Sequence, residues 1–209
     1  MIVSHESRVL FVHVQKTGGS VVSQFLLDHL EGAQKLQGLP GAKHATLKAA
    51  LRKDPALSSY WIGGFVRNPW ARLWSWFSMI ERRGQGAARS ERVSTRVERN
   101  AFWSGVLGGG MDFEEFVMTG PERFRRLRTP QVDYLTTPTR SVDFVGRTET
   151  FAQDFAAVAE RLGIEADRPV ERGNAGPRDD YRTHYTPAMR DRVAEVFAAD
   201  LRAYGYEFD

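Results

Sequence analysis

Residues 9–20 read VLFVHVQKTGGS, an apolar run that stops at a lysine, a threonine and two glycines. The run is rich in β-branched and apolar residues, which predicts a strand buried on both faces of a parallel sheet. Gly18 and Gly19 allow close approaches and backbone dihedrals that other residues avoid. Ser20 is a suitable N-cap for a helix over residues 21–30. The stretch therefore predicts a strand, a tight turn and the start of a helix.

This turn has the chemistry of an anion site. The N-terminus of a helix presents unpaired N–H groups and the positive end of the helix dipole, and both favour negative charge. Lys16 adds a full positive charge beside them. The loop differs from a Walker A motif, in which the lysine follows the glycines. Taken alone, the pattern also fits a structural turn with a solvated lysine.

A second motif follows the same plan. Residues 60–67, YWIGGFVR, are again typical of a strand. Asn68 and Pro69 then match an N-cap and a proline at the first helical position. Arg67 is thus predicted at the carboxyl end of a strand, the edge where open α/β sheets bind ligands. Ser75 is predicted two turns into the helix.

Together, the QKTGGS and RNPWARLWS segments resemble the two donor-binding motifs of sulfotransferases that use 3′-phosphoadenosine 5′-phosphosulfate (PAPS). The first resembles their 5′-phosphosulfate loop, and its HVQKTGGS form is most similar to the heparan sulfate 6-O-sulfotransferase branch. The second resembles their 3′-phosphate motif, with Asn68 in place of the usual aspartate. The resemblance spans most of the chain and is weakest over residues 82–110.

The resemblance implies a role for each motif residue. Lys16 would stabilise the bridging oxygen as its bond to sulfur breaks, and the N–H groups of the loop would hold the 5′-phosphate. Arg67 and Ser75 would bind the 3′-phosphate, and no metal would be needed. The donor-binding residues implied in this way are Lys16, Thr17, Gly18, Gly19, Ser20, Arg67 and Ser75.

The reaction also needs a base, because the acceptor hydroxyl loses its proton as it attacks sulfur. His44 lies between the two motifs, where glycan sulfotransferases commonly have a catalytic histidine or glutamate, and neutral imidazole suits this task near pH 7. Glu31 and Asp54 are weaker candidates, and a loop histidine with only a capping role is the alternative. His13 alternates with valines along the predicted strand, which favours a core histidine.

The chain has 209 residues, 42% of them hydrophobic and 26% charged, which fits a single globular domain over residues 1–209. We expect an α/β fold of the P-loop-like sulfotransferase type, with a mainly parallel sheet and helices on both faces. Residues 82–110 are basic and polar, which favours a mobile insertion or lid, with a plain solvated insertion as the alternative. The absence of cysteine excludes disulfides and thiolate metal sites.

Net charge and hydropathy limit the ligands and the cellular location that we expect for the protein. The net charge is +3, with arginine in excess of lysine, which suits an anionic donor but is too small to indicate nucleic acid. A membrane helix needs about 20 apolar residues, and no run in the chain approaches that length. The first residues lack the order of a signal peptide, so we expect a cytoplasmic enzyme.

These features predict transfer of a sulfuryl group from PAPS to a hydroxyl acceptor, a carbohydrate or glycolipid. One alternative is a P-loop kinase or nucleotide hydrolase, which the displaced lysine disfavours. The other is a non-catalytic binder of acidic polymers, which would use the arginines of residues 82–99 and 123–128.

Three local patterns complete the prediction. Residues 1–7 are expected to form a short arm, and residues 141–146 a further strand. Thr150 and Gln153 are expected to form a capping box at the start of the helix that follows.

Overall fold

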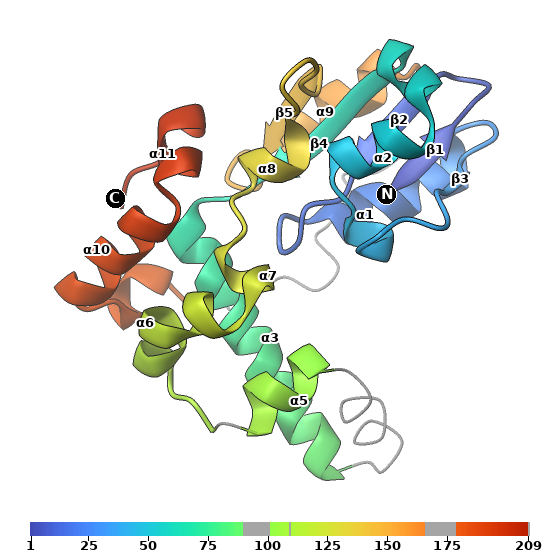
Figure 1. Cartoon of the computed structure of the whole chain (residues 1–209). Helices are drawn as coiled ribbons and strands as arrows, with labels where there is room; N and C mark the ends of the chain where they lie inside the picture. The colour runs from blue at the N-terminus through green and yellow to red at the C-terminus, as the bar shows by residue number, and fades with distance from the viewer. Residues whose placement is uncertain (90–100, 109, 166–178, 209) are drawn as a thin grey trace. The chain divides into compact units, whose positions relative to one another are not determined.

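The computed structural model describes residues 1–89, 101–108, 110–165 and 179–208, which form two compact units (Figure 1). The first unit holds the described residues of Met1–Asn68 and Gln131–Asn174, and the second those of Pro69–Pro130 and Ala175–Asp209. The chain therefore leaves the first unit after Asn68 and returns to it at Gln131. Because compactness alone does not decide what folds independently, the single domain over residues 1–209 stays a prediction.

The first unit contains a mixed five-stranded sheet in the order β3-β1-β2-β4-β5. The strands are β1 (Ile2–Ser4), β2 (Val9–Val12), β3 (Gln34–Lys35), β4 (Trp61–Val66) and β5 (Phe144–Arg147). Strands β2, β4 and β5 run parallel, whereas β1 is antiparallel to both β2 and β3. The α/β class is confirmed, but the expectation of a mainly parallel sheet is wrong.

The difference arises at the N-terminus, where we expected an arm. Ile2 pairs with Phe11 and Ser4 with Val9, so that β1 and β2 form a hairpin. Arg8 ends the connection with a φ of 53°, in the left-handed region that helps a short loop reverse the chain. A strand of three residues is too short to show a period of two in the sequence, and for this reason the hairpin was missed.

Helices cover both faces of this sheet, as predicted. The helices of the unit are α1 (Gly19–His29), α2 (Leu47–Lys53), α8 (Val132–Leu135) and α9 (Phe151–Arg161), with short 3₁₀ turns η1 (Ala42–His44) and η2 (Pro55–Ser59). On one face, Phe25 of α1 meets Phe155 of α9 with ring centroids 4.7 Å apart, above Phe11 and Phe65 of the sheet. On the other face, α8 lies against Gly64 of β4 and contacts α2.

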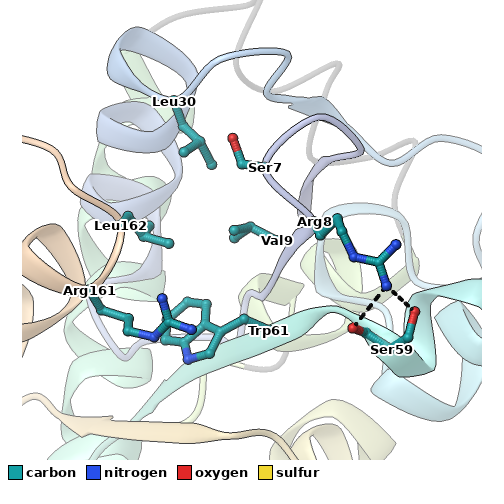
Figure 2. A pocket seen from close by; sticks show the side chains of 8 residues that line it. All are labelled: Ser7, Arg8, Val9, Leu30, Ser59, Trp61, Arg161 and Leu162. Carbon is teal, nitrogen blue, oxygen red and sulfur yellow. Dashed lines mark hydrogen bonds between the residues drawn. The ribbon is translucent and has the colours of Figure 1, made fainter.

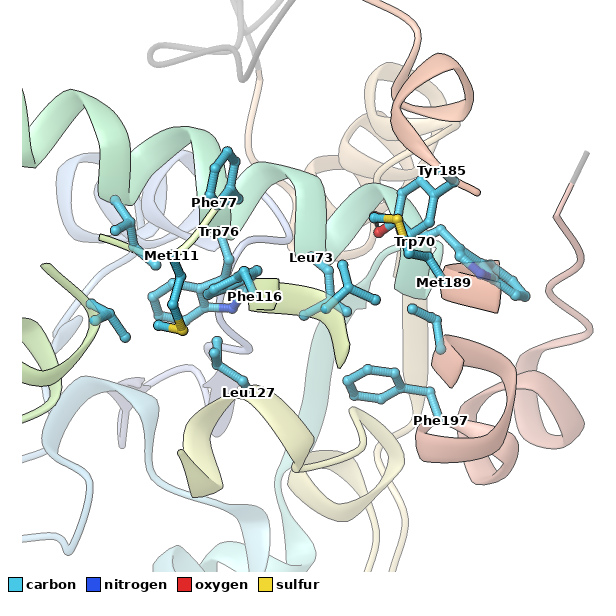
Figure 3. Packing of buried hydrophobic residues seen from close by; sticks show 14 residues of the cluster. Trp70, Leu73, Trp76, Phe77, Met111, Phe116, Leu127, Tyr185, Met189 and Phe197 are labelled. Atoms are coloured by element: carbon cyan, nitrogen blue, oxygen red, sulfur yellow. Dashed lines mark hydrogen bonds between the residues drawn. The ribbon is translucent and has the colours of Figure 1, made fainter. Parts of the chain in front are cut away.

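In the second unit, all regular elements among the described residues are helices. Its elements are α3 (Pro69–Arg89), α5 (Ala101–Gly108), α6 (Phe113–Arg123), α7 (Arg125–Arg128), η3 (Tyr181–His184), α10 (Pro187–Val196) and α11 (Ala198–Tyr204). Helix α3 begins at Pro69, as predicted, and its Leu73 and Trp76 pack in a core with Phe116 and Phe197 (Figure 3). No helix among the described residues is long and apolar enough to cross a membrane.

The segment expected to be an insertion or lid is partly described. Helix α3 continues to Arg89 and α5 occupies residues 101–108, whereas residues 90–100 and 109 lie outside the described residues. The guanidinium carbon of Arg83 lies 4.4 Å from the centre of the Trp103 ring, and Trp103 packs against the core of the second unit. The described part is thus helical, and the lid stays a prediction.

The capping box expected at Thr150 is absent from the described start of α9. Thr150 precedes the helix, but its hydroxyl donates to Asp154 Oδ2 over 2.7 Å and caps no backbone N–H group. The same carboxylate oxygen accepts the Arg147 N–H over 2.7 Å. Thr150 has φ −108° and ψ 29°, outside the extended region in which an N-cap side chain reaches the first-turn N–H groups, and this explains the missing cap.

Gly64 is expected to tolerate no side chain. A Cβ at this position would lie 2.5 Å from Leu135 Cδ2 and 3.3 Å from the Val12 carbonyl oxygen. We expect Gly64→Ala to lower the free energy of unfolding by about 1–3 kcal/mol through overpacking, measured by urea denaturation. Leu135→Ala is the partner variant, and the double variant should lose less than the sum of the two. Strictly additive losses would contradict this contact.

Candidate functional site

Both sequence motifs lie at the same edge of the sheet. Strands β2 and β4 are parallel neighbours, with Val12 opposite Gly64. The loop with Lys16 follows β2, and Arg67 follows β4 directly. Because the two strands run in the same direction, their carboxyl ends meet at one edge, where α/β proteins place their ligands. The prediction that these strand ends lie side by side is confirmed.

The loop after β2 has two residues in the left-handed region. Gly18 has a φ of 79° and Lys16 a φ of 69°. This conformation is open to glycine but costs energy for lysine, and such residues concentrate at functional sites. Thr17 is fully buried between them, and its hydroxyl donates to the Val14 carbonyl oxygen over 3.0 Å. The Thr17 hydroxyl thus fixes the loop. The group of Thr17 that could bind a ligand is therefore its backbone N–H.

Helix α1 begins earlier than the sequence indicated. Its N-cap is Gly18 and its first residue is Gly19, so Ser20 lies within the first turn, exposed, and is not the cap. The left-handed Gly18 ends the loop before Ser20 is reached, and glycine is itself an accepted N-cap. Gly18 has no side chain to accept from the first-turn N–H groups, and this turn contains no acidic residue. The helix start therefore suits an external anion.

The two glycines also have a packing reason. A Cβ on Gly19 would lie 2.5 Å from Cδ2 of His13, and one on Gly18 would lie 2.8 Å from Cε2 of Phe151. Both distances are below 3.0 Å, closer than Cβ atoms normally approach other heavy atoms, so a side chain at either position would force its neighbour to move. The sequence suggested glycine for close approach to a ligand, but the structure adds that His13 and α9 press directly against the helix start.

His44 contacts His13, and His13 packs against the start of α1. The two imidazole rings meet edge to face with centroids 4.6 Å apart, and His13 in turn packs on Gly19. His44 Nδ1 is 3.1 Å from the His13 carbonyl oxygen. A carbonyl only accepts, so Nδ1 holds the proton and donates it. In the neutral ring the lone pair is then on Nε2, so that this nitrogen can accept a proton.

His13 is a core histidine, as predicted. Only 5% of its surface is exposed, and its Nδ1 lies 3.3 Å from the Ser23 hydroxyl. Burial disfavours the imidazolium and holds the pKa of His13 well below its usual 6.5, and electrostatic repulsion from His44, when protonated, acts in the same direction. His13 is therefore neutral at physiological pH and serves as an uncharged support for His44.

Side chains from distant segments hold the backbone at the exit of β4. The Arg67 N–H donates to Gln131 Oε1 over 2.9 Å, and Gln131 Nε2 donates to the Arg67 carbonyl oxygen over 2.7 Å. The next N–H group, that of Asn68, donates to Glu149 Oε1 over 2.8 Å. The Arg67 side chain is half-buried at this edge. The Arg67 backbone is thus held by side chains and not by pairing with a neighbouring strand.

The remaining candidate residues are Ser75, Asp54 and Glu31. Ser75 lies in α3 of the second unit, only 2% exposed, and its role stays a prediction. Asp54 uses Oδ1 to accept the Ala56 N–H over 3.0 Å at the start of η2, and Glu31 is exposed. The first unit thus brings together the loop after β2, His44 and Arg67.

Sequence reasoning missed the roles of Gln131, Glu149 and the His13 carbonyl. The hydrogen bonds of Gln131 and Glu149 span 64 and 81 residues, and such long-range side-chain contacts leave no periodic or capping signature. The contact between His44 and the His13 carbonyl spans 31 residues, and it too leaves no local pattern in the sequence.

A pocket of about 360 Å³ lies at the opposite end of the same strands (Figure 2). Val9 and Trp61, the first residues of β2 and β4, line it, together with Arg8. Figure 2 shows the Arg8 guanidinium directed at Ser59, to which it donates over 2.7 Å. Because Lys16 and Arg67 follow the other ends of these strands, this pocket is separate from the candidate site.

Comparison with known proteins gives one family. The model described as "Sulfotransferase family" matches residues 1–207, which include both sequence motifs. The match is to the family as a whole and does not single out the heparan sulfate 6-O-sulfotransferase branch. No curated protein and no solved structure matches the chain significantly.

The buried His13 gives a testable pH dependence. Below its ordinary pKa of 6.5 the unfolded imidazole binds a proton that the folded one refuses, so stability falls as the pH is lowered. For this residue the slope approaches about 1.4 kcal/mol per pH unit. We expect His13→Gln to make the dependence shallower by about that amount, measured by urea denaturation between pH 7.5 and 5. His29→Gln, at an exposed position, is the control. A His13→Gln slope equal to that of the wild type would contradict this assignment.

Proposed function

The chain belongs to the sulfotransferase family, and we propose that it transfers a sulfuryl group from PAPS to a hydroxyl of a carbohydrate or glycolipid. The observation that carries this proposal is the shared edge of β2 and β4, where the loop with Lys16 and the Arg67 segment emerge from adjacent parallel strands. An anionic donor with phosphates at two positions needs two such cationic points. We propose that no metal ion is required.

The loop after β2 would hold the 5′ end of the donor. The N–H groups of Thr17, Gly18, Gly19 and Ser20 are the proposed partners of the 5′-phosphate. The start of α1 at Gly19 without a capping side chain supports this, as does its lack of an acidic first-turn residue. Lys16 would offset the negative charge on the bridging oxygen as its bond to sulfur breaks. When bound, PAPS supplies the sulfuryl group and leaves as adenosine 3′,5′-bisphosphate.

Arg67 would bind the 3′-phosphate. A guanidinium presents paired N–H donors that match two phosphate oxygens, and this geometry is worth more than a single charge. The fixed backbone of Arg67, with hydrogen bonds of 2.9 and 2.7 Å to Gln131, would hold the side chain in place for this contact.

His44 is the proposed base. As the acceptor oxygen bonds to sulfur, the bond from sulfur to the phosphate oxygen breaks and its electron pair goes to that oxygen. The hydroxyl proton goes to His44 Nε2. The hydrogen bond from Nδ1 to the His13 carbonyl, 3.1 Å long, supports this role because it orients the ring and stabilises the imidazolium that forms.

The donor site can be tested by calorimetry. We expect adenosine 3′,5′-bisphosphate to bind the wild type, and Arg67→Ala to weaken binding by about 10- to 100-fold, the worth of hydrogen bonds to a charged group. Arg52→Ala, at an exposed position in α2 of the same unit, is the matched control. Binding of ATP with Mg²⁺ in place of the bisphosphate would contradict the proposal and favour a nucleotide kinase or hydrolase.

The base can be tested by kinetics. We expect His44→Ala to lower turnover by about 10²- to 10⁴-fold while adenosine 3′,5′-bisphosphate still binds. Turnover is measured as release of the bisphosphate from PAPS in the presence of a panel of sugar acceptors. His29→Ala is the control. A variant with unchanged turnover would remove His44 from the mechanism and leave the donor site standing.

A further inference from the structure

We infer that Gln131 is a positioning residue for Arg67: its side-chain amide fixes the Arg67 backbone and thereby aims the guanidinium at the donor 3′-phosphate. This inference rests on the proposed function, because it gives Gln131 a purpose only if Arg67 binds that phosphate. It is carried by geometry alone, namely two hydrogen bonds of 2.9 and 2.7 Å between one side chain and one backbone residue.

The strand pairing of β4 ends before Arg67 on both sides. On one side of β4, the pairing with β2 reaches Val12 opposite Gly64. On the other side, the pairing with β5 reaches Val66 opposite Arg147, and Thr148 adds two bonds to the Val66 carbonyl, from its N–H and its hydroxyl. Arg67 is the first residue beyond both ladders. Its N–H and carbonyl therefore need partners other than strands.

The side-chain amide of Gln131 provides these partners. A primary amide carries a carbonyl and N–H groups in one plane, so Gln131 can pair with Arg67 as a peptide of a neighbouring strand would. It accepts from the Arg67 N–H and donates to the Arg67 carbonyl at the same time. Two bonds to one residue restrain its backbone on both sides, whereas a single bond would leave a hinge.

Gln131 is fully buried, with 0% of its surface exposed. A buried amide is costly unless its polar atoms are paired, and here its oxygen and nitrogen both are. The restraint is therefore stiff, because neither bond can be exchanged readily for water. An arginine side chain is long and flexible, so a fixed Cα is the part of its placement that the fold can supply.

The same strand provides a matched comparison at its other end. Asp143 Oδ2 accepts the Ile62 N–H over 2.8 Å, so a side chain also holds the backbone where β4 begins. Ile62 lies near the amino end of β4, away from Arg67. Loss of either side chain should lower stability, but only the loss of Gln131 should disturb the Arg67 contact with phosphate.

The test compares two nucleotides that differ only in the 3′-phosphate. For each protein we would measure the dissociation constants of adenosine 5′-phosphate and adenosine 3′,5′-bisphosphate by calorimetry and take their ratio. We expect a large ratio for the wild type and a ratio near one for Arg67→Ala. Gln131→Met keeps the length of the side chain but makes neither bond, and it should lower the ratio by about tenfold or more. Asp143→Ala should lose stability yet keep the wild-type ratio.

The outcomes separate the two proposals. If Arg67→Ala lowers the ratio but Gln131→Met does not, the inference is overturned and the donor site stands. If the wild type binds the two nucleotides equally, or neither, the proposed 3′-phosphate site fails and the inference with it. Should Gln131→Met not fold, Gln131→Asn keeps an uncharged amide but is one methylene shorter, so it cannot make both hydrogen bonds to the Arg67 backbone. Its ratio should fall below that of the wild type, and an unchanged ratio would overturn the inference.

Discussion

The parallel pairing of β2 with β4 is the constraint on which the candidate site depends. It fixes Val12 opposite Gly64, so the chain leaves both strands at the same edge of the sheet. The pairing also needs Gly64 to be a glycine, because Leu135 of α8 occupies the space above it. Without this register, the lysine loop and Arg67 would be two unrelated motifs. With it, they are two cationic points on one edge.

Beyond the ends of these strands, the backbone is hydrogen-bonded by side chains and no longer by neighbouring strands. Thr17 bonds to the Val14 carbonyl, His44 to the His13 carbonyl and Gln131 to both backbone groups of Arg67. Each is a contact between a side chain and a backbone group that has left regular pairing. Such bonds satisfy buried polar groups and fix a conformation without adding a strand, which leaves the edge open for a ligand. The edge is thereby organised before any ligand arrives.

His13 connects the parts of this edge. Its ring packs on Gly19 at the start of α1 and meets the ring of His44, while its carbonyl accepts from His44. Burial keeps His13 neutral, so His13 itself adds no positive charge beside His44. A neutral ring can be packed against the helix start at little electrostatic cost. A core histidine in the sequence thus acts as the support of the proposed base.

The sequence alone determined the elements that local signals specify. An apolar run, a glycine turn and an amphipathic segment predicted β2, its loop and α1, and Pro69 marked the start of α3. Lys16 and Arg67 were placed at strand ends in this way, because motifs and caps act over a few residues, whereas His44 was proposed from its position between the two motifs, as the family resemblance implies. The tertiary structure alone decided the antiparallel β1, the cap at Gly18 and the hydrogen bonds between Gln131 and the Arg67 backbone. These depend on contacts between segments that only the folded topology brings together, and no local pattern encodes them.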